Sequence, residues 1–413
     1  MDRASGRTVS ALVTADERRL GVIGPFPVDS PWWADVEPVV SHLEQALGVP
    51  VMVLRLLSVE GGEGARDGHA TYHVEALRHP RRELPAPWPA GPGDPVGPAA
   101  RRAGWATAPG VRAALDWADR ALRASGRPAS GPVEQVKTWN LSGLFRIPTS
   151  RGPAWLKTTP RFAAGESAVI EAFSRVASEI VPVVVAADPA RRWMLLDHVP
   201  GVDCWDAAED VIGDAVTGLV AAQAAIAERG EGIPAGIPDR TPRVLAGMVN
   251  ELLDGEVAAE LSAGELSAAR RLAARLPELI ASLEACGLPY TLVHGDFHPG
   301  NIRSDGRRTV MVDFADGHFG HPVLDGLRLH DFTHDDGRSA LVAGVWAEAW
   351  SARVPGCDPA RALSVAGPLA HLAYAVRYQE FLDNIEHSER LYHAGDPAGE
   401  VRAALECARR TGS

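Results

Sequence analysis

Cysteine is scarce in this sequence, and its cysteines are far apart. The chain of 413 residues has four, Cys204, Cys286, Cys357 and Cys407, and no two of them form a Cys-x-x-Cys pair. Zinc knuckles need closely spaced ligand pairs, and disulfide frameworks belong to short, cysteine-rich chains. The sequence therefore argues against both classes, and we expect four ordinary buried thiols.

The chain also lacks an excess of positive charge and a long hydrophobic run. Its 41 Lys and Arg against 53 Asp and Glu leave a formal net charge of −12, which disfavours nucleic acid and anionic lipid and favours a cationic small molecule. Residues 1–20 lack the apolar centre of a signal peptide, and no stretch approaches the roughly 18 apolar residues of a membrane span. We expect a cytoplasmic protein that binds neither nucleic acid nor a membrane.

The remaining composition is that of a globular enzyme, with 46% hydrophobic and 23% charged residues. A chain of this length predicts two or three domains. Residues 1–110 are expected to form a small accessory α+β domain that ends in a linker rich in Pro and Gly, residues 84–110. A strand-rich lobe over 111–200 and a helical lobe over 201–413 would follow, so the fold class is α+β.

Hydrophobic periodicity places the expected elements within these regions. Helices are predicted at 35–48, 111–126, 163–178, 214–230 and 268–287. Strands are predicted at 49–57, 70–78, 141–148, 153–159, 180–187 and 192–199.

The segment "YTLVHGDFHPGNIR", residues 290–303, combines an apolar strand with a polar loop. Asp296 and Asn301 follow the strand's end. Downstream, Asp305-Gly306 is a strong hairpin signal. If the turn centres on these two residues, facing positions sum to about 611, so Asn301 lies near Val310 and Asp313 returns toward residues 298–301.

An amide and two carboxylates at one place form a set of hard oxygen ligands suited to Mg²⁺ rather than zinc. Phosphoryl transfer uses such a set, because it needs a metal clamp on the phosphates, an aspartate for the hydroxyl proton and a lysine for the nucleotide. The order Asp296, four residues, Asn301, then Asp313 after a later strand supplies the first two requirements.

On these residues the sequence resembles the aminoglycoside phosphotransferase family of the protein-kinase-like superfamily over roughly residues 130–390. The pattern His-Gly-Asp, four residues, Asn is present from His294 to Asn301, and the pattern Asp-aromatic followed by Gly-x-Pro-x-x-Asp is present from Asp313 to Asp325. Two departures are Phe314, where the family often has Trp, and Gly326, where it usually has Leu. A protein kinase is disfavoured, because no Ala-Pro-Glu segment follows Asp313.

The resemblance implies a bilobal kinase-like fold, with the accessory domain in front of it. It implies that Asp296 accepts or orients the proton of the acceptor hydroxyl, and that Asn301 and Asp313 bind Mg²⁺. Asp325 would hold the loop through hydrogen bonds. The two histidines, His294 and His298, are expected to support the loop rather than to act as general bases.

A kinase-like site also needs a lysine on a strand and a glutamate on the next helix. Lys157 lies at the end of the strand predicted at 153–159. Of the two candidate glutamates, Glu166 shares the apolar stripe of the following helix, whereas Glu171 points nearly the opposite way. A carboxylate on a core-facing stripe needs a cationic partner, so we predict a contact between Lys157 and Glu166. The alternative for Glu166 is a water-exposed position in the first helical turn.

The nucleotide contacts are predicted from two further segments. No Gly-x-Gly-x-x-Gly precedes Lys157, so Ser142 and Gly143 would cradle the phosphates of ATP, or of GTP as the alternative. The residues Asp197, His198 and Val199 resemble the hinge that binds adenine through backbone groups; the alternative is an ordinary linker.

The acceptor is predicted to be a hydroxyl-bearing small molecule, such as an aminoglycoside or another antibiotic. Glu380, Asp383 and Glu386 recur at helical spacing and form either an acidic edge for amines or a solvated face. The alternative function is a non-catalytic regulator that binds a nucleotide or a partner.

Overall fold

The computed structural model describes residues 6–16, 18–81, 84, 86–88, 94, 96–230, 232–333 and 336–411. Part of the predicted linker, at residues 85, 89–93 and 95, lies outside this part of the chain. The chain divides into two compact units. The first comprises Met1–Arg161, Val185–Asp197 and Phe381–Ala394, and the second comprises Phe162–Val184, His198–Glu380 and Gly395–Ser413.

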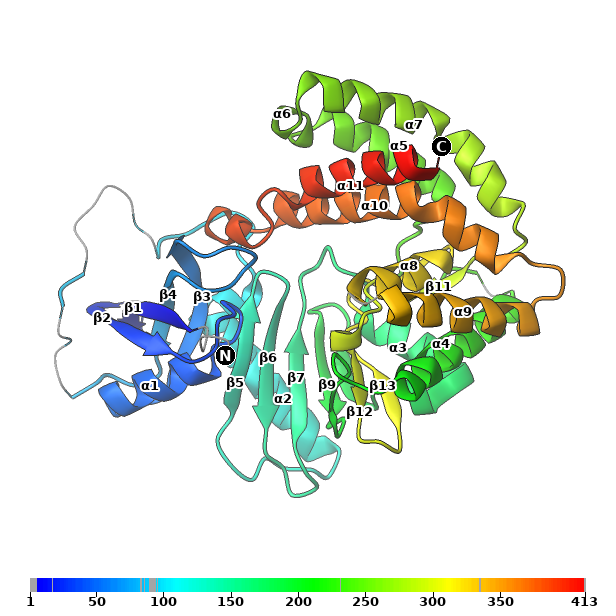
Figure 1. The fold of residues 1–413 in the computed structure, drawn as a ribbon. Helices are drawn as coiled ribbons and strands as arrows, with labels where there is room; N and C mark the ends of the chain where they lie inside the picture. Colours follow the sequence, from blue (N-terminus) through cyan, green and yellow to red (C-terminus); the bar gives the residue numbers. More distant parts are fainter. Residues whose placement is uncertain are drawn as a thin grey trace. The chain divides into compact units, whose positions relative to one another are not determined.

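The first unit begins with a four-stranded sheet of order β2-β1-β4-β3 and one helix (Figure 1). Its elements are β1 (Arg7–Ala15), β2 (Arg18–Val28), α1 (Glu37–Leu47), β3 (Val51–Glu60) and β4 (His69–Ala76). Val39 and Leu43 of α1 are buried in one core with Val9 and Val13 of β1, so the helix covers one face of the sheet. The predictions of α1, β3 and β4 are confirmed, whereas β1 and β2 were not predicted.

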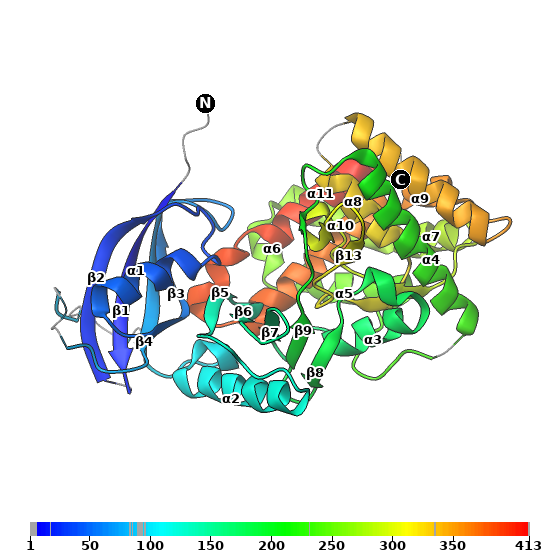
Figure 2. The same ribbon diagram turned by 90° about the horizontal axis from the view of Figure 1, so that it is seen from below.

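A five-stranded sheet of order β5-β6-β7-β9-β8 follows, antiparallel from β5 to β9, with a helix beside it (Figure 2). The helix is α2 (Ala108–Ala124), preceded by the short 3-10 helix η1 (Gly104–Ala106). The strands are β5 (Glu134–Trp139), β6 (Ser142–Ile147), β7 (Ala154–Thr158), β8 (Val184–Asp188) and β9 (Trp193–Asp197). The helix α2 begins at a Thr107 cap that accepts the Gly110 N–H, as expected for this residue type. Its buried side chains share a core with Phe145, Leu156 and Leu195.

A segment from the far end of the sequence completes the first unit. This segment, Phe381–Ala394, contains the 3-10 helix η4 (His387–Tyr392). Tyr392 is buried in the core of the first sheet and packs edge-on against Trp33 and Trp139. The unit therefore depends on contacts between residues more than two hundred positions apart.

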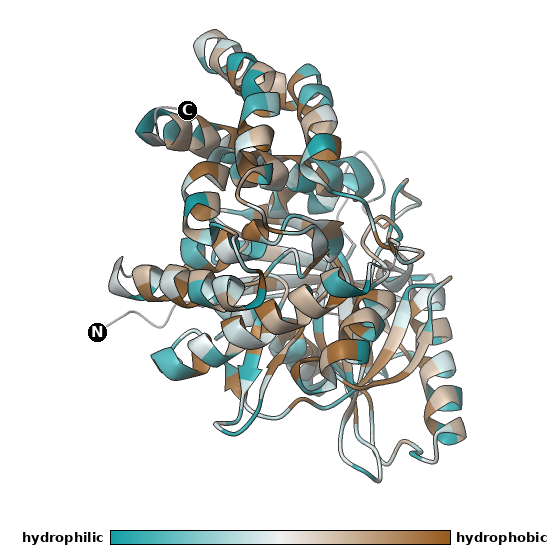
Figure 3. Cartoon of the chain, turned by 90° about the vertical axis from the view of Figure 1, so that its right-hand side faces the viewer, coloured by the Kyte–Doolittle hydropathy of each residue, from teal (hydrophilic) through white to brown (hydrophobic). Residues whose placement is uncertain are grey.

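The second unit consists mainly of helices. They are α3 (Glu166–Ala177), with η2 (Ser178–Ile180) after it, α4 (Glu209–Arg229), α5 (Pro242–Asp254), α6 (Val257–Glu260), α7 (Ala263–Glu284), α8 (Val323–Phe332), α9 (Asp336–Arg353), α10 (Pro359–Asn384, whose last residues belong to the first unit) and α11 (Asp396–Thr411). Short strands lie between them: β10 (Val202–Asp203), β11 (Thr291–Val293), β12 (Ile302–Ser304), β13 (Thr309–Met311) and β14 (His318–Gly320). Figure 3 shows brown and teal residues mixed along the helices, as expected when one face of each is buried. The predicted α+β class, with strands early and helices late, is confirmed.

Helix α4 is long and apolar enough to cross a membrane by length and composition, with a mean hydropathy of 1.3, which corrects the expectation that no stretch comes close. It packs against α3, α9 and β11. Gln223, in its middle, is fully buried and donates a hydrogen bond to Asp325. These contacts are those of a core helix.

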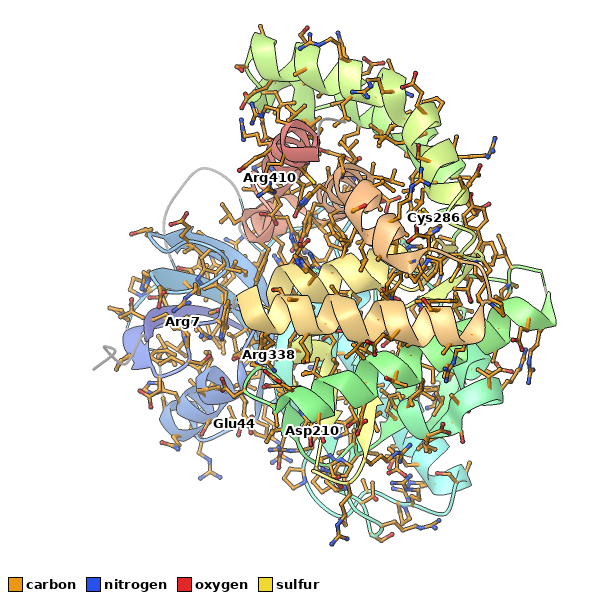
Figure 4. The ribbon with its side chains drawn as sticks, turned by 45° about the vertical axis from the view of Figure 1, so that its right-hand side comes forward. Arg7, Glu44, Asp210, Cys286, Arg338 and Arg410 are labelled. Carbon is orange, nitrogen blue, oxygen red and sulfur yellow. The ribbon has the colours of Figure 1, made fainter. Side chains whose placement is uncertain are left out.

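None of the four cysteines, all of which lie in the described part of the chain, forms a disulfide. Cys204 and Cys286, the latter labelled in Figure 4, are buried, and Cys357 and Cys407 are half-buried. The predicted domain boundaries at residues 110 and 200 stay predictions.

Candidate active site

The loop after β11 is held by one buried carboxylate. Asp325 accepts the backbone N–H groups of His294 (2.8 Å) and Gly295 (2.9 Å) and the side-chain amide of Gln223 (2.8 Å). Its burial raises its pKa to about 7, and the three donors oppose this rise. The expectation that Asp325 ties down the loop is confirmed.

Two residues of the loop explain its path. Gly295 has φ +86°, and a Cβ there would lie 2.1 Å from the carbonyl oxygen of Asp316, so only glycine fits. His294 is fully buried, and its Nε2 lies 3.1 Å from the carbonyl oxygen of Val312. Burial lowers its pKa to about 4, so the ring is neutral and supports the loop, as its expected structural role requires.

The hairpin that follows has a different register from the predicted one. Ile302 pairs with Met311 and Ser304 with Thr309, so facing positions sum to 613, which is two more than predicted. The cause is a four-residue turn in which the Asp305 side chain accepts the N–H groups of Arg307 and Arg308. Asn301 therefore faces Val312, whose N–H donates to the Asn301 carbonyl (2.9 Å), and not Val310. The corrected register keeps Asp313, the next residue, close to Asn301.

Asn301 is directly bonded to Asp296. Its side-chain amide donates to the Asp296 carbonyl oxygen (2.9 Å) and to Oδ2 of the carboxylate (3.0 Å). Both contacts use the nitrogen, so the amide oxygen points away from Asp296. Asp313 has φ +65°, a backbone conformation that costs a non-glycine residue energy and gathers at functional sites.

Besides Asn301, two further side chains hold the Asp296 carboxylate. Arg328 of α8 donates to Oδ1 from Nε (2.9 Å) and Nη2 (2.8 Å), and Nε2 of His298 lies 3.3 Å from Oδ2. Burial opposes ionisation of Asp296, but the charge of Arg328 and the hydrogen bonds from His298 outweigh it, so its pKa is lowered below the usual range. Sequence analysis missed Arg328. Its position three residues after Asp325 on a helix was the available signal, because residues i and i+3 share a face.

The donor set fits a magnesium ion. Among the described residues no three His, Cys, Asp or Glu side chains gather into a metal cluster. Mg²⁺ does not need one, since it binds through one or two carboxylates together with substrate phosphates and waters. The amide oxygen of Asn301 and the carboxylate of Asp313 have this chemistry.

The predicted lysine and glutamate lie in different units. Lys157 is buried on β7 in the first unit. Glu166 opens α3 in the second unit and is buried with the apolar stripe of that helix, which excludes the water-exposed alternative. Its Oε1 accepts the Phe314 N–H (3.1 Å), next to Asp313 in sequence. Glu171 is exposed and pairs with Arg175. Burial of Glu166 rather than Glu171 is confirmed, and the contact with Lys157 stays a prediction.

Ser142 and Gly143 begin β6, just after the turn from β5. The Ser142 hydroxyl accepts a hydrogen bond from the Trp139 indole (2.9 Å), which leaves its O–H free to donate. The Gly143 N–H donates to the Thr158 hydroxyl (3.1 Å), and a Cβ at Gly143 would lie 3.1 Å from the Trp105 ring. The turn is packed by aromatic side chains, and one of the two expected phosphate contacts is used inside the sheet.

The predicted hinge crosses from one unit to the other. Asp197 ends β9 in the first unit and forms an ion pair with Arg127 (2.8 Å). His198 and Val199 belong to the second unit, where the Val199 carbonyl accepts a hydrogen bond from Arg303 (3.3 Å). Adenine binding by these residues stays a prediction.

The predicted acidic edge is only partly solvated, because Asp383 is exposed, whereas Glu380 and Glu386 are paired with arginines. Glu380 accepts from Arg240 and Arg377. Glu386 lies beyond the end of α10, is buried and pairs with Arg55 and Arg102. Three of the four arginine partners, Arg240, Arg55 and Arg102, come from distant parts of the sequence, which a helical spacing pattern cannot show. The fourth, Arg377, lies three residues before Glu380 on α10.

Comparison with known proteins places these motifs in a family. The phosphotransferase enzyme family, abbreviated APH, matches residues 129–363. A glucosamine kinase of Streptacidiphilus jiangxiensis is 30% identical over 241 residues, covering 52% of this chain and 45% of that protein. The chain thus spans about half the length of this curated relative.

Two solved structures resemble the chain in fold. A choline/ethanolamine kinase family protein of Mesorhizobium loti has a TM-score of 0.51 at 18% identity, and covers 72% of this chain and 98% of its own. The choline kinase of Streptococcus pneumoniae has a TM-score of 0.52 at 10% identity, and covers 71% and 98%. At these identities the likeness concerns the fold alone.

Proposed function

The chain belongs to the phosphotransferase enzyme family, and from this premise we propose that it transfers the γ-phosphate of ATP to a hydroxyl of a small molecule. The proposal includes dependence on Mg²⁺, with GTP as the alternative donor. It also includes action in the cytoplasm.

The observation that carries the proposal is the arrangement of Asp296, Asn301 and Asp313. The Asn301 amide nitrogen donates to the carboxylate of Asp296. The Val312 N–H donates to the Asn301 carbonyl, so the hairpin register places Asp313, the next residue after Val312, close to Asn301. Asp296 would serve the acceptor hydroxyl, and the carboxylate of Asp313 with the amide oxygen of Asn301 would serve a cation. This division of roles is what phosphoryl transfer requires.

Each residue has a role in the proposed reaction. The acceptor oxygen forms a bond to the γ-phosphorus, the bond to the bridging oxygen breaks, ADP leaves, and Asp296 takes or orients the hydroxyl proton. Asn301 and Asp313 would hold Mg²⁺, which when bound neutralises charge on the phosphates. Lys157, paired with Glu166, would hold the nucleotide, together with the Ser142 hydroxyl and the backbone at Gly143 and at 197–199.

The proposed class of acceptor is supported by a relative's name and by the net charge of the chain, and not by the fold. The relative's name, glucosamine kinase, supports a polyhydroxylated compound, a class that includes aminoglycoside antibiotics. The net charge of −12 favours a cationic acceptor, although the arginine partners of Glu380 and Glu386 reduce what these two carboxylates contribute to it.

One observation favours a second candidate, a regulator that binds a nucleotide without transferring phosphate. The Gly143 N–H is already bonded to Thr158, which removes a donor from the expected phosphate cradle. A regulator of this kind would bind ATP and release no ADP with any acceptor.

The test is an ADP-release screen of the full chain against hydroxyl compounds, including amino sugars, neutral sugars and aminoglycosides. The proposal expects acceptor-dependent, Mg²⁺-dependent ADP release. Calorimetric binding of ATP with no acceptor-dependent ADP release across the screen would support the regulator instead.

A further inference from the structure

The helix α8 contacts the candidate catalytic loop at three consecutive residues. Asp325, in its first turn, accepts the N–H groups of His294 and Gly295. Arg328, one turn later, donates to the side chain of Asp296. The first contact fixes the backbone of the loop, and the second acts on the carboxylate itself.

The two oxygens of Asp296 have different partners. Oδ1 receives both hydrogen bonds from Arg328. Oδ2 receives the Asn301 amide at 3.0 Å and lies 3.3 Å from Nε2 of His298. The Gly300 N–H donates to Nδ1 of His298 (3.1 Å), so in the neutral ring the proton is on Nε2 and points toward Oδ2. The His298 contact, at 3.3 Å, is therefore the longest of the four, whereas both contacts of Oδ1 with Arg328 are shorter than 3.0 Å.

Arg328 is itself rigidly held. Its guanidinium lies 4.5 Å from the ring centre of Phe332 and 4.6 Å from that of Tyr374, and its Nη2 lies 3.4 Å from the Tyr378 hydroxyl. The Tyr374 hydroxyl donates in turn to the Leu324 carbonyl (3.1 Å). A guanidinium between two aromatic rings keeps its plane and its donors fixed.

The same packing continues to the surface beside the loop. His298 stacks against Phe332, at 4.8 Å, and against Trp205, at 5.4 Å, and these two rings also contact each other, at 5.9 Å. Arg338, labelled in Figure 4, donates to the carbonyl oxygens of Trp205 and Ala207. Arg328 and His298, two of the three partners of the carboxylate, are thus both packed against Phe332.

We propose that Arg328 is a positioning residue that anchors Oδ1 of Asp296 and presents Oδ2 to the acceptor hydroxyl, which takes the place of the His298 N–H. The inference rests on the proposed function, because it assigns the acceptor side of that reaction. Arg328 touches the carboxylate and acts through it. Misplacement of a reacting group by about 1 Å costs on the order of 10²-fold in rate, which sets the size of the expected effect.

The experiment compares Arg328→Ala, Arg328→Lys and Arg328→Gln with the wild type, using an acceptor found in the ADP-release screen. Arg328→Ala is expected to lower kcat about 10²-fold while calorimetric ATP affinity stays within about twofold of wild type, because the nucleotide side is untouched. Added guanidinium at millimolar concentration is expected to raise the kcat of Arg328→Ala at least about tenfold, which recovers part of the loss. Arg328→Lys, with one compact cation, should retain more activity than the alanine variant but less than the wild type.

Two controls separate this inference from folding and from the proposed function. Arg243→Ala removes an exposed arginine paired with Glu284 and should leave kcat unchanged. Arg328→Gln keeps most of the side-chain volume, so it serves if the alanine variant does not fold, and the expected loss of kcat is the same.

The possible outcomes are distinguishable. A folded Arg328→Ala or Arg328→Gln with kcat within twofold of wild type overturns the positioning role, and so does loss of kcat with no response to guanidinium and an equal loss in the lysine variant. If Asp296→Ala keeps full turnover, the proposed function itself fails.

Discussion

The loop at 294–301 and the turn between β5 and β6 are built in different ways. In the loop, polar groups are brought together and bonded to one another: Asp296 to Asn301 and Arg328, and the backbone to Asp325. In the turn, aromatic side chains do the packing, and the Gly143 N–H is used within the sheet. The proposed acceptor side is thus held by hydrogen bonds, whereas the proposed nucleotide side is shaped by packing.

The largest expected effect is at the end of the hairpin. Asp313→Ala removes the proposed anionic metal ligand and should abolish the Mg²⁺-dependent part of ATP binding, measured by calorimetry with and without Mg²⁺. Asp305→Ala, in the exposed turn of the same hairpin, is the control and should bind normally. Unchanged titration of Asp313→Ala would contradict the metal assignment.

The next effect tests how the loop is held. Asp325→Asn puts an amide N–H₂ where the carboxylate accepts three donors, so at least one buried donor loses its acceptor. The free energy of unfolding, measured in urea, should fall by about 2–4 kcal/mol, and kcat should fall with it. Asp254→Asn removes an exposed ion pair with Arg270 and should cost less than about 1 kcal/mol. An equal loss of unfolding free energy in the two variants would contradict the role of the buried Asp325 carboxylate in holding the loop.

A dependence of stability on pH is expected in the first unit, which contains the β5–β6 turn and the 3-10 helix η4. Burial, with the nearby charge of Glu386, raises the pKa of Glu389 to about 8. The folded protein then keeps this proton up to about pH 8, while the unfolded chain releases it near the ordinary value of 4.5. Stability should therefore fall as pH rises from about 4.5 to 8, because the folded state binds more protons there.

Glu389→Gln tests this sign directly. The amide oxygen can still accept the Leu56 N–H, which Glu389 accepts at 3.2 Å. Relative to wild type, the variant should gain stability between pH 5 and pH 8.5, on the order of a few kcal/mol, in urea unfolding. Glu278→Gln, at an exposed glutamate, should show no such gain. A constant difference between Glu389→Gln and wild type across this range would contradict the prediction.

The smallest effect concerns the turn itself. Ser142→Ala removes one hydroxyl that accepts from Trp139 and can donate to a phosphate oxygen. One neutral hydrogen bond is worth about 0.5–1.5 kcal/mol, so the KM for ATP should rise severalfold with kcat little changed. A rise of more than about a hundredfold would show that the turn binds phosphate as strongly as the metal side.

Sequence information sufficed where a site is local. Asp296, Asn301 and Asp313 lie within eighteen positions of one another, and the burial of Glu166 follows from helical periodicity. The hairpin register was wrong by two because the Asp305 side chain closes a longer turn than Asp-Gly alone indicates.

The remaining features depend on contacts between distant residues. The pairing of Glu386 with Arg55 and of Asn140 with the Glu389 carbonyl joins segments hundreds of positions apart, and no pattern in either segment shows it. The strand β2 was missed for a different reason, because it contains two glycines and two prolines, Gly21, Gly24, Pro25 and Pro27, which are depleted in strands. Arg328 was missed although its helical spacing from Asp325 was visible.

The most direct test of the account is the turnover of Asp296→Ala, measured with the acceptor from the ADP-release screen beside its ATP affinity. Loss of phosphate transfer by about 10³-fold or more, with ATP affinity within a few fold of wild type, is the predicted result. Turnover close to wild type would contradict the assignment of Asp296 as the acceptor-side carboxylate.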